Sequence, residues 1–565
     1  MFKFLLIIII FYTNSIHSEI LNQRDQKLYL KIFDQYRNGD FKNGEINIAK
    51  LDNNILLGHV EALKLLHPTK HRSSFLELKN WLNEYNDHYE SRRIYKLSVK
   101  RMPKGSKSPK KSSSPILEKK YLTKLKNEKN VNLTITRKIF TKKNYSQKIS
   151  IYNTIRSRVG KGWPTGALEY LNQNNKILSD YERSFLLSKI ANGYYLANLD
   201  DKAIKILEND SFIKAPYPDG LWIKGLAHYR MNEFEKSSKS FLILSKTSDN
   251  NWLRSAGAYW SFISSSKMQN KADFMKASIE ALEIACSMPY TLYSLLSCFV
   301  INKPIDVNNG KEFDELNQNY KQFSATKFGQ RIEALLEINE IGIAEFELDR
   351  AQKTSNEAFK KIILGFAINN DLSSLQVKTT KLLFGEGADI NLLYPSPKWM
   401  DNFNINNLDK NLVMGVVRQE SQFSPFAKSG KSAYGLMQVL PSTAKMMDRT
   451  KDFIGNRRLL FDPSINLDVG TKYIKSLLSI NYIQGDLLKT LISYNAGPGN
   501  FSKWSKKITY NNDSFLLIES IPSRETRLFV ERVLTNIIIY EYLNNKSQDY
   551  AKQLVETNTI ILSHD

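Results

Sequence analysis

Apolar residues recur with a helical period along almost the whole chain, which predicts an all-α protein. The sequence contains almost no convincing signal for β-strands, because a strand would show apolar and polar residues in strict alternation. Between Glu19 and Arg101, apolar stripes with spacings of three and four residues indicate amphipathic helices. The stripes consist of Leu56, Val60, Leu63 and Leu66, and of Phe75, Leu78, Trp81 and Leu82. We therefore expect an N-terminal helical region over residues 19–100.

An internal repeat is present in the middle of the chain. Tyr195 and Ala203 correspond to Tyr229 and Ser237 at an offset of 34 residues, which is the period of tetratricopeptide repeats. One helix pair cannot bury its apolar face alone, so we expect residues 149–402 to stack into a TPR-like α-superhelical domain, a solenoid or ring. Taken alone, this half of the chain suggests a protein-binding scaffold.

Three segments outside these regions have a distinct composition. Residues 1–18 combine Lys3, an apolar stretch and a small residue at Ser18, which predicts a cleaved signal peptide and an exported protein. A permanent N-terminal anchor is the alternative. Residues 101–148 are rich in Lys, Pro and Ser and are predicted to be a basic linker or loop, serving either as a tether to a polyanionic surface or as a solvated spacer. Residues 546–565 are expected to form a C-terminal tail.

Composition and charge narrow the class of protein. With 42% hydrophobic and 24% charged residues, the 565-residue chain is not wholly disordered, collagen-like or a polytopic membrane protein. A formal charge of +23 favours polyanionic partners such as nucleic acid, acidic lipid or an anionic cell-wall polymer, although biased codon usage explains a Lys-rich chain equally well. Cys286 and Cys298 either pair in an oxidising compartment or remain buried free thiols.

The last third of the chain contains a carboxyl group on an apolar helical stripe. Asp409 is a plausible N-cap, and Val413 and Val417 continue a stripe that Glu420 joins seven and three residues later. A carboxyl group on the buried side loses hydration, which raises its pKa and keeps it protonated near neutral pH. Glu420 is therefore a candidate general acid, and a structural, hydrogen-bonded glutamate is the alternative.

Four motifs follow one another at suitable distances in this region, between Asp409 and Tyr542. They are Arg418-Gln419-Glu420-Ser421, Tyr434-Gly435-Leu436-Met437-Gln438, Ser493-Tyr494-Asn495-Ala496-Gly497 and Ser523-Arg524-Glu525-Thr526-Arg527. This series resembles the soluble lytic murein transglycosylases of bacterial cell walls, whose catalytic domain is similar to goose-type lysozyme (glycoside hydrolase family 23 type). The resemblance implies a lysozyme-like SLT domain over residues 403–545.

The same resemblance assigns roles to individual residues. It places the single catalytic acid/base at Glu420, and it places Tyr494 and Glu525 near the catalytic pocket. Further positions expected to bind or support the substrate are Ser421, Ser429, Gln438, Leu440 and Asn495. The turn that begins at Asn495 would also end a helix in almost any fold, because Gly497 permits positive φ and Pro498 stops a helix.

The chain departs from the family pattern at three positions. Leu440 stands where Met is common, Ser493 where Ala is usual, and Phe529 where Tyr often follows the Glu-Thr-Arg triplet. Leucine conserves the volume of methionine, so Leu440 puts substrate preference in doubt more than activity.

The resemblance implies cleavage of the MurNAc-GlcNAc β-1,4 bond with formation of 1,6-anhydro-MurNAc ends. The residues themselves support one carboxylate rather than the usual pair, because no Asp or Glu occurs from Ser421 to Met447. A partner could still fold back from elsewhere in the chain; the candidates are Asp448, Asp462, Asp468 and Glu525. The alternatives are a hydrolytic muramidase that uses the same Glu420, and a non-catalytic glycan-binding scaffold.

Other cofactor and partner classes have no support in the sequence. The seven histidines lack ligand spacing and no Gly-rich phosphate loop occurs, so we predict no metal and no cofactor. The expected partners are peptidoglycan glycan strands and, through the superhelical region, cell-wall synthesis or remodelling proteins. No nucleic acid and no transmembrane span after signal cleavage are expected, and the resemblance implies a periplasmic location.

Overall fold

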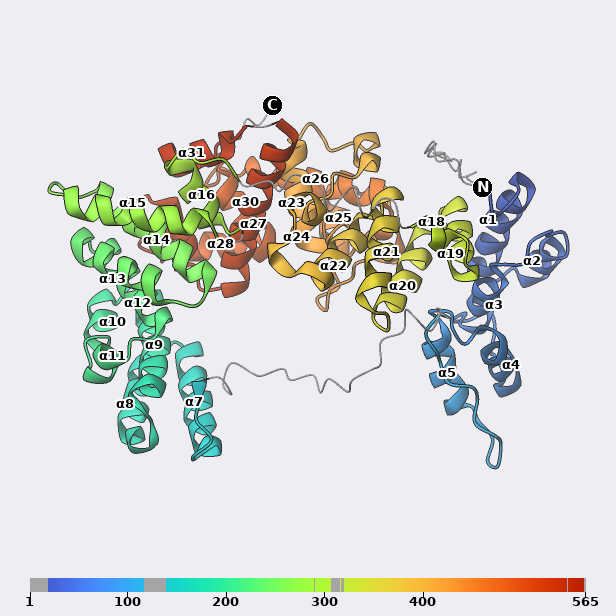
Figure 1. The fold of residues 1–565 in the computed structure, drawn as a ribbon, viewed down its shortest axis with the longest axis horizontal. Helices are drawn as coiled ribbons and strands as arrows, with labels where there is room; N and C mark the ends of the chain where they lie inside the picture. Colours follow the sequence, from blue (N-terminus) through green and yellow to red (C-terminus); the bar gives the residue numbers. More distant parts are fainter. Residues whose placement is uncertain are drawn as a thin grey trace. The chain divides into compact units, whose positions relative to one another are not determined.

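The computed structural model describes residues 19–115, 139–288, 290–305, 316, 320–545 and 547–562. Every extended regular element in these ranges is a helix, and β-structure is limited to three isolated bridges (Figure 1). The prediction of an all-α chain is therefore confirmed. The predicted signal peptide and residues 116–138 of the predicted linker lie outside the described residues. No helix in the described part of the chain combines the length and apolar character that crossing a membrane requires.

The helices form two compact units that do not follow chain order. The first unit combines residues 1–126 with 310–383, and the second combines residues 127–309 with 384–565. Each unit therefore brings together segments that are far apart in the sequence. The domain boundaries given above on sequence grounds stay a prediction.

The first unit joins five N-terminal helices to five helices from the middle of the chain. They are α1 (Gln23–Asn38), α2 (Phe41–Ile48), α3 (Leu57–Leu65), α4 (Phe75–Tyr85) and α5 (Ser91–Lys100), then α18 (Lys321–Ser324), α19 (Lys327–Glu337), α20 (Ile341–Gln352), α21 (Glu357–Asn369) and α22 (Ser373–Phe384). Their shared core contains Tyr29 and Phe33 from α1 with Ile332 from α19. Burial of such side chains drives the two segments together.

The first half of the second unit consists of stacked helix pairs. They are α7 (Tyr145–Gly160), α8 (Pro164–Gln173), η2 (Asn175–Ile177), α9 (Asp180–Leu196), α10 (Asp200–Ile206), α11 (Asp210–Lys214), α12 (Pro218–Arg230), α13 (Phe234–Thr247), α14 (Asn251–Ser266), α15 (Ala272–Cys286) and α16 (Leu292–Val300). Neighbouring helices pack in chain order from α12 to α16 (Figure 1). Tyr195 and Tyr229, the residues of the predicted repeat, lie buried at equivalent places near the ends of α9 and α12.

The second half of this unit contains the sequence motifs. Its helices are η3 (Gly385–Gly387), α23 (Ile390–Leu393), η4 (Lys398–Asn402), α24 (Lys410–Ser421), α25 (Pro441–Met447), η5 (Arg457–Phe461), α26 (Pro463–Leu478), α27 (Leu487–Ala496), α28 (Pro498–Ser505), α29 (Ser514–Ser520), α30 (Arg524–Asn545) and α31 (Asp549–Thr557). The long helix α30 packs against α24 and α27. The segment predicted as a tail includes α31, which buries Tyr550 and Leu554.

One hydrophobic core runs through both halves of the second unit, and polar contacts reinforce it. The Tyr229 hydroxyl donates to Asp513 Oδ2 at 2.7 Å, and Trp252 Nε1 donates to Glu531 Oε2 at 2.5 Å. Because these donors are satisfied across the boundary between the stacked pairs and the motif-bearing helices, the relative placement of the two halves is fixed by specific bonds as well as by burial.

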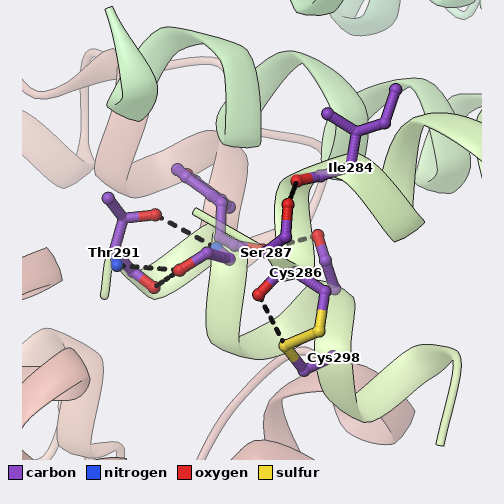
Figure 2. Close-up of a disulfide and its surroundings, with 8 residues drawn as sticks. Ile284, Cys286, Ser287, Thr291 and Cys298 are labelled. Atoms are coloured by element: carbon purple, nitrogen blue, oxygen red, sulfur yellow. Dashed lines mark hydrogen bonds between the residues drawn. A yellow bond between two sulfur atoms is a disulfide. The ribbon is translucent and has the colours of Figure 1, made fainter. Parts of the chain in front are cut away.

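The two cysteines form a disulfide in the second unit. Cys286 ends α15 and Cys298 lies in α16, with their Cα atoms 4.8 Å apart and their sulfur atoms bonded (Figure 2). Helix α16 also contacts α30 and α31, so the bridge lies where the stacked pairs meet the C-terminal helices. Of the two states left open by the sequence, the paired state is the one in the structure.

Replacing both cysteines by serine is expected to lower the free energy of unfolding by about 2–3 kcal/mol, because the bridge closes a short loop in the unfolded chain. Urea unfolding of wild type and the double variant, each with and without reductant, measures this difference. Reductant should lower the stability of wild type alone. Equal stability of all four samples would contradict the prediction.

Candidate active site

Glu420 lies in the last turn of α24, and the sequence determines where this helix begins and ends. Asp409 caps the N-terminus by accepting bonds from the Asn411 and Leu412 N–H groups, which confirms the predicted N-cap. Gln422 ends the helix in the left-handed region at φ 50°. Gly415 allows close packing on α30, because a Cβ there would lie 2.7 Å from Ile537 Cγ1.

The Glu420 carboxyl group is isolated from any compensating positive charge. Its side chain is partly buried, and none of the described residues gives it a hydrogen bond or an ion pair. Burial first, and then the negative charge of Glu525, raise the pKa of Glu420 to about 8. The group is therefore protonated at neutral pH, as a general acid must be.

Tyr494 supports the loop next to Glu420. Its hydroxyl on α27 donates to the Met437 carbonyl at 2.6 Å, and its ring stacks on Phe529 with 6.1 Å between ring centres. Burial and then the charge of Glu420 hold the pKa of Tyr494 well above its usual range, so the phenol stays neutral. Phe529, one of the departures from the family pattern, is thus a packing partner of Tyr494.

The loop containing Tyr434 to Gln438 is held by a buried asparagine. Asn466 of α26 is fully buried; its Nδ2 donates to the carbonyls of Tyr434 and Leu460, and its Oδ1 accepts the Met437 N–H at 2.8 Å. Gly435 has φ 77°, and a Cβ there would lie 2.2 Å from the Leu460 oxygen. Only glycine fits this position without strain, which explains the Tyr-Gly-Leu-Met-Gln motif locally.

Glu525 lies in the first turn of α30 and faces solvent. Its side chain is 68% exposed and forms an ion pair with Lys431 at 3.1 Å. The charge of Glu525 acts on Glu420, so the two motifs that contain them, more than 100 residues apart in sequence, contribute to one electrostatic environment.

This arrangement can be compared with known proteins. Residues 398–515 match the family model for the transglycosylase SLT domain. The chain carries a transglycosylase SLT domain.

Curated relatives match over the region of the SLT domain. The chain is 32% identical over 155 residues to a putative soluble lytic murein transglycosylase from Haemophilus influenzae, which covers 27% of this chain and 26% of the relative. It is also 32% identical over 137 residues to the soluble lytic murein transglycosylase of Escherichia coli K12, covering 24% and 21% of the two chains. The chain thus matches about a quarter of the length of these relatives.

Solved structures match over almost the entire chain at low sequence identity. A lytic transglycosylase from Pseudomonas aeruginosa, in an inactive mutant form, superposes with a TM-score of 0.54 at 16% identity, covering 93% of this chain and 88% of the other. The 70-kDa soluble lytic transglycosylase in complex with bulgecin A gives a TM-score of 0.60 at 15% identity, covering 93% and 97%. The likeness extends the shared fold beyond the SLT domain to the stacked helices, in agreement with the predicted fold class.

The remaining residues predicted to serve the site have local partners in the SLT domain and its flanks. Gln438 has φ 47°, and its Nε2 donates to the carbonyls of Ala427 and Gly435. The Ser429 hydroxyl accepts the Ala433 N–H at 3.0 Å. These bonds shape the loop between α24 and α25. Contact with a substrate stays a prediction for both residues.

The other three predicted residues differ in exposure. The Ser421 hydroxyl is buried and donates to the Val417 carbonyl, whereas Leu440 is 41% exposed at the N-cap of α25. Asn495 Oδ1 accepts a bond from the Thr526 hydroxyl, which connects the end of α27 to α30. Leu440 is thus the most accessible of the three to a glycan.

Sequence reasoning missed two residues that organise the SLT domain. Asn466 was missed although it is a polar residue among the apolar positions of α26, which is the signal that could have revealed it. Arg418 holds α24 by stacking 3.6 Å above the Tyr394 ring and by donating to Asn536 Oδ1. Neither contact has a local signature, because the partners of Arg418 lie 24 residues before it and 118 residues after it.

Proposed function

We propose that this chain is a peptidoglycan lytic transglycosylase that cleaves the MurNAc-GlcNAc β-1,4 bond and leaves 1,6-anhydro-MurNAc ends. The observation that carries the proposal is the protonated, unpartnered Glu420 within an SLT domain. Glycosidic bond cleavage needs an acid that is still protonated near neutral pH, and burial provides one here.

The carboxylates near Glu420 in sequence support catalysis by one carboxyl group. Asp448 pairs with Lys451 at 2.5 Å, Asp468 pairs with Lys472 at 2.7 Å, and Asp462 caps α26. Each of these groups is thus engaged in a local contact, and Glu525 is the carboxylate whose charge acts on Glu420. An enzyme with two cooperating carboxylates would place a second one beside the bond to be cleaved.

The proposed reaction moves one proton through Glu420 twice. Glu420 donates its proton to the glycosidic oxygen while the bond from C1 to that oxygen breaks. The 6-hydroxyl oxygen of the same MurNAc residue then bonds to C1, and its proton returns to the Glu420 carboxylate. No water is consumed, so the released strand ends in an anhydro ring and the enzyme is regenerated.

The neighbouring residues have supporting roles in this proposal. Tyr494 fixes the loop at Met437 and keeps a neutral phenol next to Glu420. Glu525 contributes negative charge that favours the protonated acid and would stabilise positive charge developing at C1. Ser421, Ser429, Gln438, Leu440 and Asn495 are proposed to support or contact the glycan.

The setting of the proposed activity is the periplasm, after export through the predicted signal peptide at residues 1–18. A formal charge of +23 suits a substrate that carries lactyl and peptide carboxylates. Cell-wall synthesis or remodelling proteins are proposed as partners of the superhelical region.

Digestion of isolated sacculi followed by borohydride reduction tests the proposal. Anhydro ends cannot be reduced, so the released muropeptides should have the same mass before and after treatment. Products that gain two hydrogens would instead establish a hydrolytic muramidase. Tight binding to sacculi without release of sugars would support a glycan-binding scaffold.

The rate should depend on pH through Glu420. The acid is required in its protonated form and has a pKa of about 8, so kcat/KM is expected to fall about tenfold per pH unit above that value. Initial rates on soluble glycan strands between pH 5 and 10 measure this limb. A rate that already falls between pH 5 and 6 would contradict a raised pKa at the catalytic acid.

A further inference from the structure

A cluster of metal-ligating side chains lies in the first compact unit, remote in sequence from the SLT domain. His59 of α3, Glu90 before α5 and Glu347 of α20 are all buried, and they present ligand atoms within 4.8 Å of one another. His59 Nδ1 lies 2.9 Å from Glu90 Oε1. The histidines have no ligand spacing along the sequence, and the fold alone brings this one next to two carboxylates.

A second observation at the same place concerns unpartnered nitrogens. His59 is fully buried and its Nε2 has no hydrogen-bond partner, and the same holds for Nε2 of the buried His88. The two rings lie 4.5 Å apart between centres. A buried nitrogen without a partner is costly, and an imidazole whose Nδ1 bonds a carboxylate is in the arrangement that metal-binding histidines adopt. His88 has this arrangement too, with Nδ1 2.9 Å from Asp87 Oδ1.

The charges around the cluster leave room for a cation. Three carboxylates face it, from Asp87, Glu90 and Glu347, whereas two guanidinium groups serve the same network. Arg331 pairs with Asp87 and Glu347 at 3.0 and 2.9 Å, and Arg350 donates to backbone carbonyls and serines. One negative charge therefore remains when both imidazoles are neutral, and a buried uncompensated charge is unfavourable.

We propose that His59, Glu90 and Glu347 bind a divalent transition-metal cation of the zinc class. One imidazole and two carboxylates form a ligand set that such cations accept. The site is buried, so its role is structural: it fastens the N-terminal helices to α20, where Glu347 already accepts the Tyr89 N–H. Closing so long a stretch of chain through one ion would restrict the unfolded state and stabilise the folded unit.

Metal analysis of the full-length chain tests the proposal. The protein is stripped with a chelator and titrated with zinc chloride, and bound metal and the thermal midpoint are measured; magnesium chloride serves as the comparison salt. We expect one zinc per chain and a rise in Tm with zinc but not with magnesium. No bound zinc, or binding without a change in Tm, would overturn the proposal and leave a proton on His59 as the balancing charge.

Two variants identify the ligands. Glu90→Gln keeps the size and a hydrogen-bonding group at the cluster, and it should lose zinc binding at least tenfold. The control Glu77→Gln alters an exposed pair with His71, at 3.0 Å, and should bind zinc like wild type. Equal binding by both variants would overturn the assignment. Should Glu90→Gln not fold, the X-ray absorption spectrum of zinc-loaded wild type decides: a sulfur-free shell containing one imidazole supports the site, and a hydrated ion overturns it.

Discussion

Glu420→Gln is expected to lower kcat on peptidoglycan by about three orders of magnitude or more, because an amide cannot donate a proton and take one back. The glutamine has nearly the same size, so folding and binding to sacculi should be kept. Initial rates of sugar release and sacculus pull-down measure the two properties separately. Retained turnover would place the catalytic acid elsewhere.

A matched control for this variant is Glu519→Gln in the same compact unit. Burial raises the pKa of Glu519 to about 7, but its carboxylate accepts a bond from the Tyr293 hydroxyl and lies outside the SLT domain match. The control should keep full activity. A comparable loss of activity in both variants would mean that removal of any buried acid damages the enzyme.

The stability of Glu420→Gln should also depend on pH with a defined sign. The folded-state pKa of Glu420 is raised above its unfolded value, so the stability that this group contributes is fully present below about pH 4.5 and is lost as pH rises through about 8. Glutamine has no such dependence. The variant should therefore match wild type at pH 4 and exceed its Tm at pH 9.

Asn466→Ala is expected to have the second largest effect, with a loss of about 3–5 kcal/mol in the free energy of unfolding. The change leaves the Met437 N–H and the Leu460 carbonyl without partners inside the SLT domain, and each unmet buried group costs about 1–3 kcal/mol. Because Met437 also holds Tyr494, we expect activity to fall together with stability. Urea unfolding and sugar-release rates measure both.

Asn500→Ala is the matched control for that variant. Asn500 is exposed, and its Nδ2 donates to the Ala496 carbonyl at 2.7 Å. Its removal should change the free energy of unfolding by less than about 0.5 kcal/mol. If Asn466→Ala behaved like this control, the buried bonds to the loop would not be what holds the site together.

Local periodicity predicted much of this molecule. The stripe through Val413 and Val417 located both the N-cap at Asp409 and the partly buried Glu420. The 34-residue offset found two helices that stack as equivalent units, with Tyr195 and Tyr229 buried in each. These features depend on residues within a few turns of each other, so the sequence order contains the information directly.

The features that could not be predicted depend on distant partners. Nothing near Glu337 indicates that its carboxylate accepts the N–H groups of Ile20 and Leu21, more than 300 residues earlier. The cluster around His59 escaped for the same reason, since Glu347 comes from a helix late in the chain. Long-range pairing is a property of packing, and one sequence has no local pattern that records it.

The most direct test of the central claim is digestion of sacculi in heavy-oxygen water, with wild type and Glu420→Gln in parallel. A lytic transglycosylase closes the anhydro ring with an oxygen of the sugar itself, so muropeptides released by wild type should carry no heavy oxygen and be one water lighter than hydrolysis products. The variant should release none of them. Heavy oxygen at C1 of the wild-type products would show that water attacks the bond and would contradict the proposed reaction.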